Sequence, residues 1–436
     1  MDMNTPSAVA GFMAALARTE CLPPEHLVAY QHRLLDKLVR HARTETAFYA
    51  DRLAPLFRRD NTIDWWRWQE LPILTRTEAQ IHEAALRARS LPSIAGEAAA
   101  KTTSGSTGEP FRHVATAMQT FAAACANERF YNWHDIAPGK LSATIWAVDD
   151  DTQSTYPDGG PPKQWRIRHN DSRAVDLTIA TPVFKQVEWL RRIRPQYLAT
   201  YPTNLREIGR VAAEEGRPLM FDALLTYGEM LTEETRSHIR SYFGRGPLDR
   251  YGSTEVAFIA GACPHSMKHH IAAELVLIEI VDEDGVPAEP GTVGRIVATP
   301  FYSLAMPMIR YDTGDYGALS GEPCGCGRTL PRFDRINGRK RNIFRFADGS
   351  SIWPVLQSWI VQRFVPHRQF QVLQTALNRI EYRYVPVSPT QQNDIIGLTE
   401  YARVQLHPTI IVDAVAVDEI PRPPEGKHED YISLIA

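Results

Sequence analysis

The stretch KTTSGSTGEPFRH, residues 101–113, mixes glycine with serine and threonine between a lysine and an arginine. Glycine lets main-chain N–H groups approach an anion closely, and hydroxyl groups add further donors. The same composition is also typical of a surface turn. The common nucleotide-binding pattern, which ends in Gly-Lys-Ser/Thr, does not apply because Gly108 is followed by Glu109 and Pro110. The stretch alone therefore leaves a phosphate-binding loop and an ordinary turn both open.

Length and composition limit the class of protein. The 436 residues are too many for one compact core and predict two or three domains. A hydrophobic content of 44% with 23% charged residues is typical of a soluble globular protein. The net charge of −3 argues against a nucleic-acid or membrane partner. Residues 1–19 begin acidic and hold only a short apolar run, so we expect no signal peptide and a cytoplasmic protein.

The residue pattern along the chain predicts an α/β fold. Apolar residues spaced three and four apart predict helices over 25–46, 115–133, 183–195, 204–216 and 231–244. Runs rich in β-branched and aromatic residues predict strands over 141–148, 196–201 and 221–230. From residue 275 onward, strand-like runs divided by Asp-Gly and Pro-Gly turns predict a β-rich subdomain. The last hundred residues predict a small α+β module.

Four separated motifs then fall into a recognisable order: TTSGSTGEP at 102–110, RYGSTEV at 250–256, IRYDTGD at 309–315 and RINGRKRNIF at 335–344. Together they resemble the adenylate-forming ligase superfamily. The segments TYGEML, DRYGSTE and CGCGRTLPRFDRINGR look most like its phenylacetate-CoA ligase branch, which includes proteins named for capsule biosynthesis and coenzyme F390 synthesis. The resemblance extends from about residue 30 to residue 432.

The resemblance implies a reaction and a domain plan. Such enzymes join a carboxylic acid to the α-phosphate of ATP, release pyrophosphate, and pass the acyl group to a thiol or another nucleophile. The implied cofactors are ATP and Mg²⁺, with CoA as the default acceptor. The implied fold has a large adenylation domain, residues 1–338, and a small mobile lid, residues 339–436. The predicted partners are small molecules only, and the chain is expected to be a monomer or a homodimer.

The resemblance also assigns nucleotide-binding residues. The phosphate loop would be Thr103, Ser104, Gly105, Ser106, Thr107 and Gly108. Many relatives carry lysine at the next position, where Glu109 reverses the charge. The adenine side would be formed by Gly228, Glu229, Tyr251, Gly252 and Ser253. Thr254 would contact the α-phosphate and Glu255 would hold Mg²⁺, which prefers carboxylate oxygen.

Four further residues complete the implied active site. Asp315 would accept hydrogen bonds from the ribose hydroxyls, and Arg339 would contact the ribose or the phosphates. Arg341 stands where relatives have an aspartate or lysine hinge. Lys427, in PRPPEGKHEDY, would reach the α-phosphate and the substrate carboxylate during adenylation. A flexible ammonium group suits a residue that must arrive and leave with a moving domain.

Three of the five cysteines suggest a metal site. Cys324 and Cys326 flank one glycine, and six residues separate Cys263 from His270, which predicts a structural Cys₃His zinc site. His265 and His269 remain alternative ligands, and two free thiols remain an alternative to any metal. Cys21 and Cys125 are interpreted as ordinary helix-face residues.

The substrate pocket is less well defined. Aromatic residues after the phosphate loop predict a pocket for an aryl or other flat acid: Tyr131, Trp133, His134, Tyr156 and Trp165. The acceptor is predicted to be CoA, with a carrier-protein thiol or an amine as alternatives. A rival interpretation is a zinc-stabilised protein with a degenerate, non-catalytic nucleotide site, which Glu109 and Arg341 would favour.

Overall fold

The computed structural model describes residues 5–102, 111–147, 154–422 and 427–435. Its largest element is a seven-stranded sheet with strand order β4-β3-β5-β6-β7-β8-β9. The strands are β3 Ser142–Trp146, β4 Ala174–Thr178, β5 Tyr197–Thr200, β6 Ala223–Tyr227, β7 Leu248–Ser253, β8 Ala257–Ala262 and β9 His269–Ile271. Strands β3 to β7 pair in parallel. β8 pairs antiparallel with β7, and β9 pairs antiparallel with β8. This is the helix-flanked sheet expected from the alternating strand and helix pattern.

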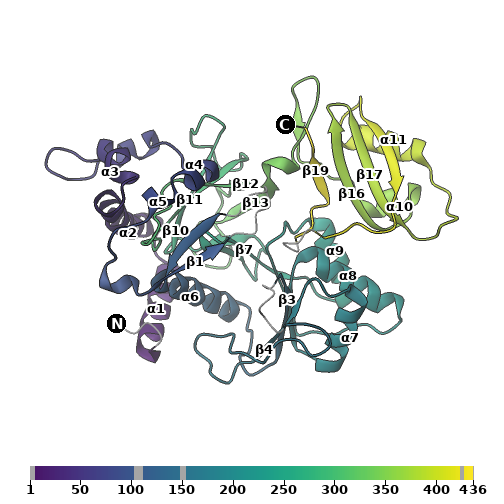
Figure 1. Ribbon diagram of the computed structural model, residues 1–436, viewed down its shortest axis with the longest axis horizontal. Helices are drawn as coiled ribbons and strands as arrows, with labels where there is room; N and C mark the ends of the chain where they lie inside the picture. The colour runs from purple at the N-terminus through teal and green to yellow at the C-terminus, as the bar shows by residue number, and fades with distance from the viewer. Residues whose placement is uncertain (1–4, 103–110, 148–153, 423–426, 436) are drawn as a thin grey trace.

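Helices cover both faces of this sheet (Figure 1). One face packs against α1 Pro6–Thr19 and α6 Ala117–Trp133. The other packs against α7 Val183–Ile193, α8 Pro202–Glu214 and α9 Glu233–Phe243. Along β5, Tyr197 and Ala199 face α6 whereas Leu198 faces α8, as the two-residue period of a strand requires. The predicted strands and helices of this region are therefore confirmed within a few residues.

A second, antiparallel sheet has the order β10-β11-β12-β13. Its strands are β10 Val276–Val281, β11 Gly294–Pro300, β12 Tyr311–Leu319 and β13 Phe333–Arg339. The turns that separate β10 from β11 contain Gly285 and Gly291, whose φ values of 85° and 83° suit glycine. This sheet is the β-rich region predicted from residue 275 onward.

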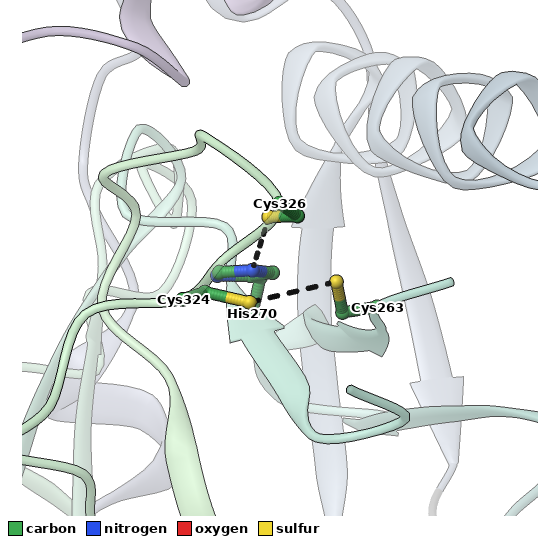
Figure 2. A group of neighbouring side chains, drawn as sticks. All are labelled: Cys263, His270, Cys324 and Cys326. Carbon is green, nitrogen blue, oxygen red and sulfur yellow. Dashed lines mark hydrogen bonds between the residues drawn. The ribbon is translucent and has the colours of Figure 1, made fainter. Parts of the chain in front are cut away.

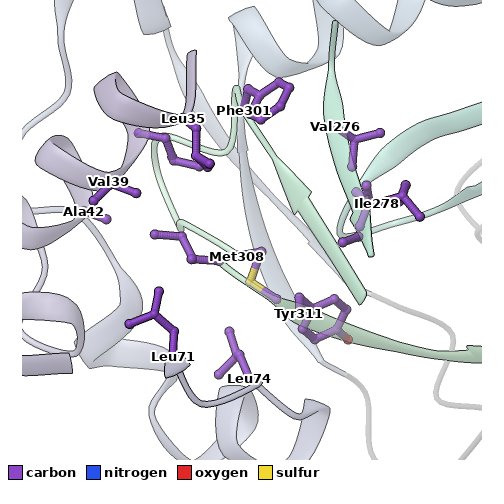
Figure 3. Packing of buried hydrophobic residues seen from close by; sticks show 14 of the residues in the cluster. Leu35, Val39, Ala42, Leu71, Leu74, Val276, Ile278, Phe301, Met308 and Tyr311 are labelled. Carbon is purple, nitrogen blue, oxygen red and sulfur yellow. The ribbon is translucent and has the colours of Figure 1, made fainter. Parts of the chain in front are cut away.

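The second sheet packs on the N-terminal helices. The longest, α2, spans Pro24–Glu45 and buries Leu35, Val39 and Ala42 on one stripe. Figure 3 shows this stripe on one side of the cluster and Val276 and Ile278 of β10 on the other, with Met308 and Tyr311, near the start of β12, between them. The remaining short helices of this region are α3 Tyr49–Arg52, η1 Ala54–Leu56, η2 Trp65–Glu70, α4 Arg76–Ile81, α5 Glu83–Leu86 and η3 Ser93–Ala95. Apolar burial therefore ties the chain's first hundred residues to the strands that carry Asp315.

A hairpin of β1 Ala98–Thr102 and β2 Arg112–Thr116 leads into α6. Its connection contains the predicted phosphate loop, Thr103 to Gly108, together with Glu109, and lies outside the described residues. The flanking pairs, Thr102 with Arg112 and Lys101 with His113, are in register. The hairpin therefore fixes where both ends of that loop leave the fold.

The C-terminal part has its own core (Figure 1). Its elements are η4 Lys340–Asn342, β14 Phe344–Arg345, β15 Ser351–Ile352, α10 Ser358–Phe364, β16 His367–Ala376, β17 Arg379–Pro386, α11 Ile395–Gln405, β18 Ile411–Ala416 and β19 Tyr431–Ser433. The four-stranded sheet has the order β18-β17-β16-β19. Its buried core runs from Phe344 to Tyr431. This is the small α+β module that the sequence predicts, and the division at residue 338 stays a prediction.

In the described part of the chain, every helix is too short or too polar to cross a membrane.

Candidate active site

Strand ends and strand pairing bring the predicted nucleotide residues together. Asp315 on β12 stands opposite Arg339 on β13 in the strand register. Tyr251 lies on β7, beside the end of β6 where Gly228 follows Tyr227. In open parallel sheets, ligands bind at the carboxyl ends of the strands. Asp315 of the second sheet therefore lies at this end of the large sheet, where its carboxylate contacts Tyr251.

Asp315 is the centre of a small polar group. The Tyr251 hydroxyl donates a hydrogen bond to Asp315 Oδ2 at 2.7 Å, and Arg339 Nε lies 3.7 Å from Oδ1. Burial raises the pKa of Asp315, while Arg339, Tyr251 and Lys427 oppose that shift. Both oxygens retain acceptor capacity for a ligand hydroxyl. The Tyr251 ring itself packs edge-on against Phe333, with ring centres 5.7 Å apart.

Lys427 enters this neighbourhood from the C-terminal segment. Gly228 has φ of 82°, and a β-carbon there would lie 3.0 Å from the Tyr201 ring and 3.6 Å from Lys427 Cε. Burial and the nearby Arg339 lower the pKa of Lys427, and the carboxylates of Asp315, Glu229 and Glu255 oppose the shift. The structure thus places a partly buried ammonium group near Asp315 and Glu255, two carboxylates predicted to bind the nucleotide and its Mg²⁺.

Glu229 contacts this segment through its side chain. Its carboxylate accepts hydrogen bonds from Thr203 Oγ1 at 2.7 Å and from the His428 main-chain N–H at 2.6 Å. The side chain is only 2% exposed. The sequence predicted main-chain contacts to adenine at this position. The carboxylate additionally joins the start of α8 to the residue after Lys427, a role that no local sequence signal indicates.

Glu255 is buried and held by two donors. Arg76 Nη1 donates to Glu255 Oε1 at 3.0 Å, and the Tyr311 hydroxyl donates to the same oxygen at 3.2 Å. Gln119 Nε2 donates to the main-chain oxygen of Glu255 at 3.1 Å. Within the described residues, Oε2 accepts no hydrogen bond. One carboxylate oxygen is therefore left for a cation or a ligand, and Arg76 is a site residue that sequence reasoning missed.

The turn before Glu255 presents Thr254 to solvent. A β-carbon on Gly252 would come within 2.2 Å of the Ala257 carbonyl oxygen, so only glycine fits there. Ser253 Oγ accepts a hydrogen bond from the Val256 main-chain N–H at 3.1 Å. Gly252 and Ser253 thus shape the turn, and Thr254 offers an exposed side chain from it.

The predicted hinge residue Arg341 lies in η4. Its Nε lies 2.9 Å and 3.1 Å from the two carboxylate oxygens of Glu429. Asn342 Nδ2 donates to Glu429 Oε2 at 2.9 Å and to the Tyr431 carbonyl oxygen at 2.7 Å. All these contacts lie on the C-terminal side of Arg339. They fix η4 to the small module and leave the Arg339–Lys340 step as its link to β13.

A separate ion pair joins the two parts. Arg206 Nη1 of α8 lies 3.4 Å from Asp430 Oδ2, and the side chains are 12% and 10% exposed. Burial raises the pKa of Asp430, but Arg206 and His428 outweigh it and hold the pKa well below its usual range. Asp430 lies three residues after Lys427. This pair therefore stabilises the position in which Lys427 lies beside Asp315.

The Cys/His cluster consists of Cys263, His270, Cys324 and Cys326 (Figure 2). One donor atom from each lies within 4.8 Å of all the others. His270 Nε2 lies 3.3 Å from Cys326 Sγ, and Cys263 Sγ lies 3.8 Å from Cys324 Sγ. His270 Nδ1 contacts the Leu330 carbonyl oxygen at 3.0 Å, which orients the ring. This three-sulfur, one-nitrogen set is the chemistry that a tetrahedral zinc ion takes.

The alternative histidines lie differently. His269 Nε2 faces Asp249 Oδ2 at 2.9 Å and is engaged there. His265 Nε2 lies close to Gly325, where an added β-carbon would meet it at 2.9 Å, but it is outside the group of four donors. The predicted choice of His270 is therefore the one that the geometry favours.

The predicted substrate-pocket residues separate into two places. Tyr131 OH accepts a hydrogen bond from Arg250 Nη1 at 2.8 Å, and its ring centre is 5.0 Å from that of Trp165. Trp133 Nε1 instead donates to Glu20 at 3.0 Å, and its ring lies 6.0 Å from that of His270. His134 Nε2 contacts the Ala262 carbonyl oxygen at 2.8 Å. Trp133 and His134 thus lie on the Cys/His side of α6, and Tyr131 lies against β7.

Tyr156 lies apart from these residues. The Lys185 ammonium group of α7 lies 5.2 Å from the Tyr156 ring centre. Glu188, also of α7, raises the pKa of the Tyr156 hydroxyl. Of the predicted aromatic residues, Tyr131 and Trp165 are therefore the two that share one cluster.

Sequence comparison finds relatives of about half the chain. A phenylacetate-coenzyme A ligase of Thermus thermophilus is 28% identical over 47% of this chain and 49% of its own length. Protein CapK of Staphylococcus aureus is 23% identical over 57% of this chain and 55% of its own length. The chain thus spans about half the length of the curated relatives it matches. No protein-family model matches the chain.

Comparison with solved structures extends over almost the whole chain. A 2-hydroxyisobutyryl-CoA ligase in its postadenylation state, with an acyl-AMP, has a TM-score of 0.76 at 19% identity, covering 96% of this chain and 91% of that chain. The same ligase in its thioesterification state has a TM-score of 0.61. The overall α/β fold predicted from the sequence is confirmed by this match. Together with the sequence relatives, it supports assigning the chain to the adenylate-forming ligase superfamily, on its phenylacetate-CoA ligase-like branch.

Proposed function

We propose that this protein is an AMP-forming acid ligase that activates a carboxylic acid as its acyl-adenylate and transfers the acyl group to the thiol of CoA. The observation that carries the proposal is the convergence of Lys427, Asp315 and Glu255 in one partly buried, charged neighbourhood. Lys427 lies against Gly228 at the end of β6, and Asp315 accepts a hydrogen bond from Tyr251 on the next strand. These three residues come from separate motifs, and each offers a group that the reaction requires. The named activities of the sequence relatives and the structural neighbour support the same reaction.

The first half-reaction joins two anions. A carboxylate oxygen of the acid attacks the α-phosphorus of ATP, the bond to the bridging oxygen breaks, and pyrophosphate leaves. The Lys427 ammonium group stabilises the charge that gathers on the α-phosphate, and Thr254 offers a hydroxyl from the turn. Asp315 accepts the ribose hydroxyls and so fixes the distance from ribose to Lys427.

Glu255 is the residue that would hold Mg²⁺. Its Oε1 is occupied by Arg76 and Tyr311, while Oε2 accepts no bond from the described residues. An oxygen held in this way suits a hard cation. Bound Mg²⁺ would neutralise phosphate charge. Arg76 fixes the carboxylate and adds positive charge to a site whose predicted loop carries Glu109.

The second half-reaction needs a different arrangement. The thiolate of CoA attacks the acyl carbon, and AMP leaves with the electron pair of the broken bond. With Lys427 beside Asp315, the protein lies in the arrangement that suits adenylation. The higher match to the postadenylation state than to the thioesterification state of the same neighbour supports this view. We infer that the small C-terminal module, with Arg341 held to Glu429, rotates about the adjacent Arg339–Lys340 step between the two half-reactions.

We assign the Cys263–His270–Cys324–Cys326 cluster to one structural zinc ion. Four protein donors fill a tetrahedral shell and leave no open position for catalysis. The ion would join the segment that follows β8 to the connection between β12 and β13. It would thereby brace the strands that carry Tyr251 and Asp315.

The test is pyrophosphate release over a panel of carboxylic acids, with hydroxylamine to trap the adenylate as a hydroxamate. Aryl acids belong in the panel because Tyr131 and Trp165 share one cluster. CoA, a phosphopantetheinyl carrier protein and simple amines are then supplied separately as acceptors. Acid-dependent pyrophosphate release with CoA-dependent AMP release supports the proposal. ATP binding without pyrophosphate release from any acid would instead support the non-catalytic alternative.

A further inference from the structure

Arg250 lies next to the proposed nucleotide site but faces the other way. It precedes Tyr251 on β7 and stands opposite Tyr227 of β6 in the strand register. Because side chains alternate along a strand, Tyr251 points toward Asp315 whereas Arg250 points toward α6. Arg250 Nη1 donates to Asn127 Oδ1 at 2.6 Å and to Tyr131 OH at 2.8 Å. One edge of the guanidinium is therefore fixed by neutral groups of α6.

The other edge of the guanidinium has no acceptor. Arg250 Nε is buried and has no hydrogen-bond partner in the described part of the chain. Nη2 likewise makes no hydrogen bond with the described residues, but unlike Nε it is not fully buried. Three aromatic rings surround the cation, those of Tyr227, Tyr131 and Phe130, with centres 5.4, 5.5 and 5.9 Å from its central carbon. The cation is thus held firmly with its Nε and Nη2 donors unused.

Arg250 is partly buried, and three fully buried arginines of the described residues are each neutralised by a carboxylate. Arg166 pairs with Glu128 at 2.8 Å, Arg129 with Glu274 at 2.7 Å, and Arg310 with Glu279 at 3.2 Å. Arg250 makes no ion pair with a described carboxylate. Because a buried charge without a partner is unfavourable, its retention calls for an anion from outside the chain. Because Nε is occluded, Nη2 is the donor that is left to bind a carboxylate oxygen, in a charge-assisted hydrogen bond.

We propose that Arg250 binds a second carboxylate on the acid substrate, so that the protein activates dicarboxylic acids. This inference rests on the proposed function and names its substrate class. Tyr227 leads directly into Gly228, which lies against Lys427, so the ring cluster and the nucleotide site share the end of β6. The reacting carboxylate belongs on the Lys427 and Thr254 side, and Arg250 faces away from it. A substrate that reaches both positions must carry two anionic ends.

The experiment compares matched acids in the hydroxamate assay: glutarate with valerate, and isophthalate with benzoate. The wild-type protein is expected to show a kcat/KM at least about tenfold higher for a diacid than for its monoacid partner, as charge-assisted hydrogen bonds provide. In R250Q, an amide can keep one donor toward α6 but has no charge. The diacid-to-monoacid ratio is expected to fall by about tenfold or more. R250K, which keeps the charge but not the planar guanidinium that donates to both α6 and a ligand, should give an intermediate ratio.

R245Q is the matched control. Arg245 is exposed, lies five residues upstream, and donates to the Asp222 carbonyl oxygen. Its replacement should leave the diacid-to-monoacid ratio unchanged. Thermal unfolding of each variant shows whether the protein is folded, and R250K provides the comparison if R250Q is not.

The outcomes separate this inference from the proposed function. Monoacids activated as well as diacids by the wild type, or equal loss of both in R250Q, would overturn the second carboxylate and leave the ligase intact. No activation of any acid would overturn the ligase. In that case, calorimetric titration of wild type and R250Q with glutarate and isophthalate decides the inference, because only an Arg250 site binds the diacids in the wild type alone.

Discussion

The nucleotide cluster around Asp315 and the Cys/His cluster are both assembled from segments far apart in the chain, but they differ in completeness. At the first, burial raises the pKa of Asp315 and lowers the pKa of Lys427, so both groups are pressed toward neutrality. At the second, four donors already converge and His270 is oriented by Leu330. The nucleotide cluster is completed by a bound ligand and by the position of Lys427, whereas the Cys/His cluster is completed by a single ion.

This difference implies that the two clusters contribute differently to catalysis and to stability. Charged groups that are partly removed from solvent contribute little to the stability of a fold, but they are suited to binding an incoming polyanion. Donors that complete one coordination shell give stability and restrict motion. We therefore expect changes at the nucleotide cluster to alter rates with little change in stability. Changes at the Cys/His cluster should alter stability first.

Lys427→Ala should have the largest effect on rate. Loss of the ammonium group beside Asp315 is expected to lower the rate of adenylation by about 10³-fold, on the scale of removing one transition-state donor. Transfer from preformed adenylate to the thiol should persist, because that step uses the other domain position. Single-turnover pyrophosphate release and thioester formation measure the two steps. Lys37→Ala, at an exposed lysine of α2, is the control, and equal loss of both steps would contradict the role of Lys427.

Metal removal should give the largest effect on stability. A chelator, or Cys326→Ser, is expected to lower the free energy of unfolding by more than about 4 kcal/mol, a loss typical of a missing structural metal. Elemental analysis should find about one zinc ion per chain, since four donors form one shell. Cys21→Ser, at an exposed cysteine outside the cluster, should change neither measurement. A metal-free protein of undiminished thermal stability would remove the zinc assignment.

The sequence predicted the members of both clusters where a local motif carries them. Asp315, Tyr251 and Lys427 lie in short motifs whose order is recognisable, and the structure brings them together. The spacing of Cys324 and Cys326 likewise indicated a shared turn. Residues that act through one long-range contact carry no such signal. Arg76 reaches Glu255 across 179 positions, and nothing around Arg76 distinguishes it from a surface arginine.

The residues that line the substrate pocket could not be predicted from the sequence, for a different reason. Helix α6 is buried on most sides, so its 3.6-residue period does not tell which face meets the substrate. Tyr131 and Trp133, two residues apart, consequently point to different neighbours, Arg250 and Glu20. Aromatic composition indicated a pocket near this helix but could not assign its walls.

Arg76→Gln tests whether the Glu255 carboxylate is held for a cation. Without Arg76, Glu255 Oε1 keeps only the Tyr311 hydroxyl as a donor, so the carboxylate is oriented less firmly. The Mg²⁺ concentration for half-maximal adenylation is expected to rise by about tenfold, the effect of losing a residue that orients a metal ligand. Magnesium titrations of pyrophosphate release at saturating ATP give this value. Arg52→Gln, which breaks the ion pair between Arg52 of α3 and Glu78 of α4, is the control. An unchanged or lower Mg²⁺ requirement in the Arg76 variant would contradict the idea.

The pH dependence of adenylation tests whether Lys427 acts as a charged group with a lowered pKa. In the free enzyme, burial lowers the pKa of Lys427 below its ordinary value of 10.5, so the group loses its proton as pH rises toward that value. The kcat/KM for ATP should therefore decline with pH on the alkaline side, starting below pH 10.5. Lys427→Arg should abolish this decline because guanidinium stays charged. The same decline in that variant would assign it to another group.

The smallest effect is expected where the two parts of the protein meet. Arg206→Gln removes the partner of Asp430 on the segment that carries Lys427, and so weakens the arrangement that suits adenylation without touching the nucleotide. Adenylation should slow by about three- to tenfold, as a coupling of roughly 1 kcal/mol implies, while thiol transfer from preformed adenylate is kept or accelerated. Arg210→Gln is the control, because Arg210 pairs with Glu207 and Glu214 of its own helix.

The double variant Arg206→Gln, Asp430→Asn decides whether this pair acts as one unit. If the two side chains stabilise the same domain position, the double variant slows adenylation less than the product of the single effects. Zinc content and thermal stability should stay close to those of the wild type, since the Cys/His cluster lies within the large domain. A loss of both half-reactions together would mean that Arg206 supports the fold of α8. Selective loss of adenylation would instead show that the nucleotide cluster depends on a contact that must form and break in every catalytic cycle.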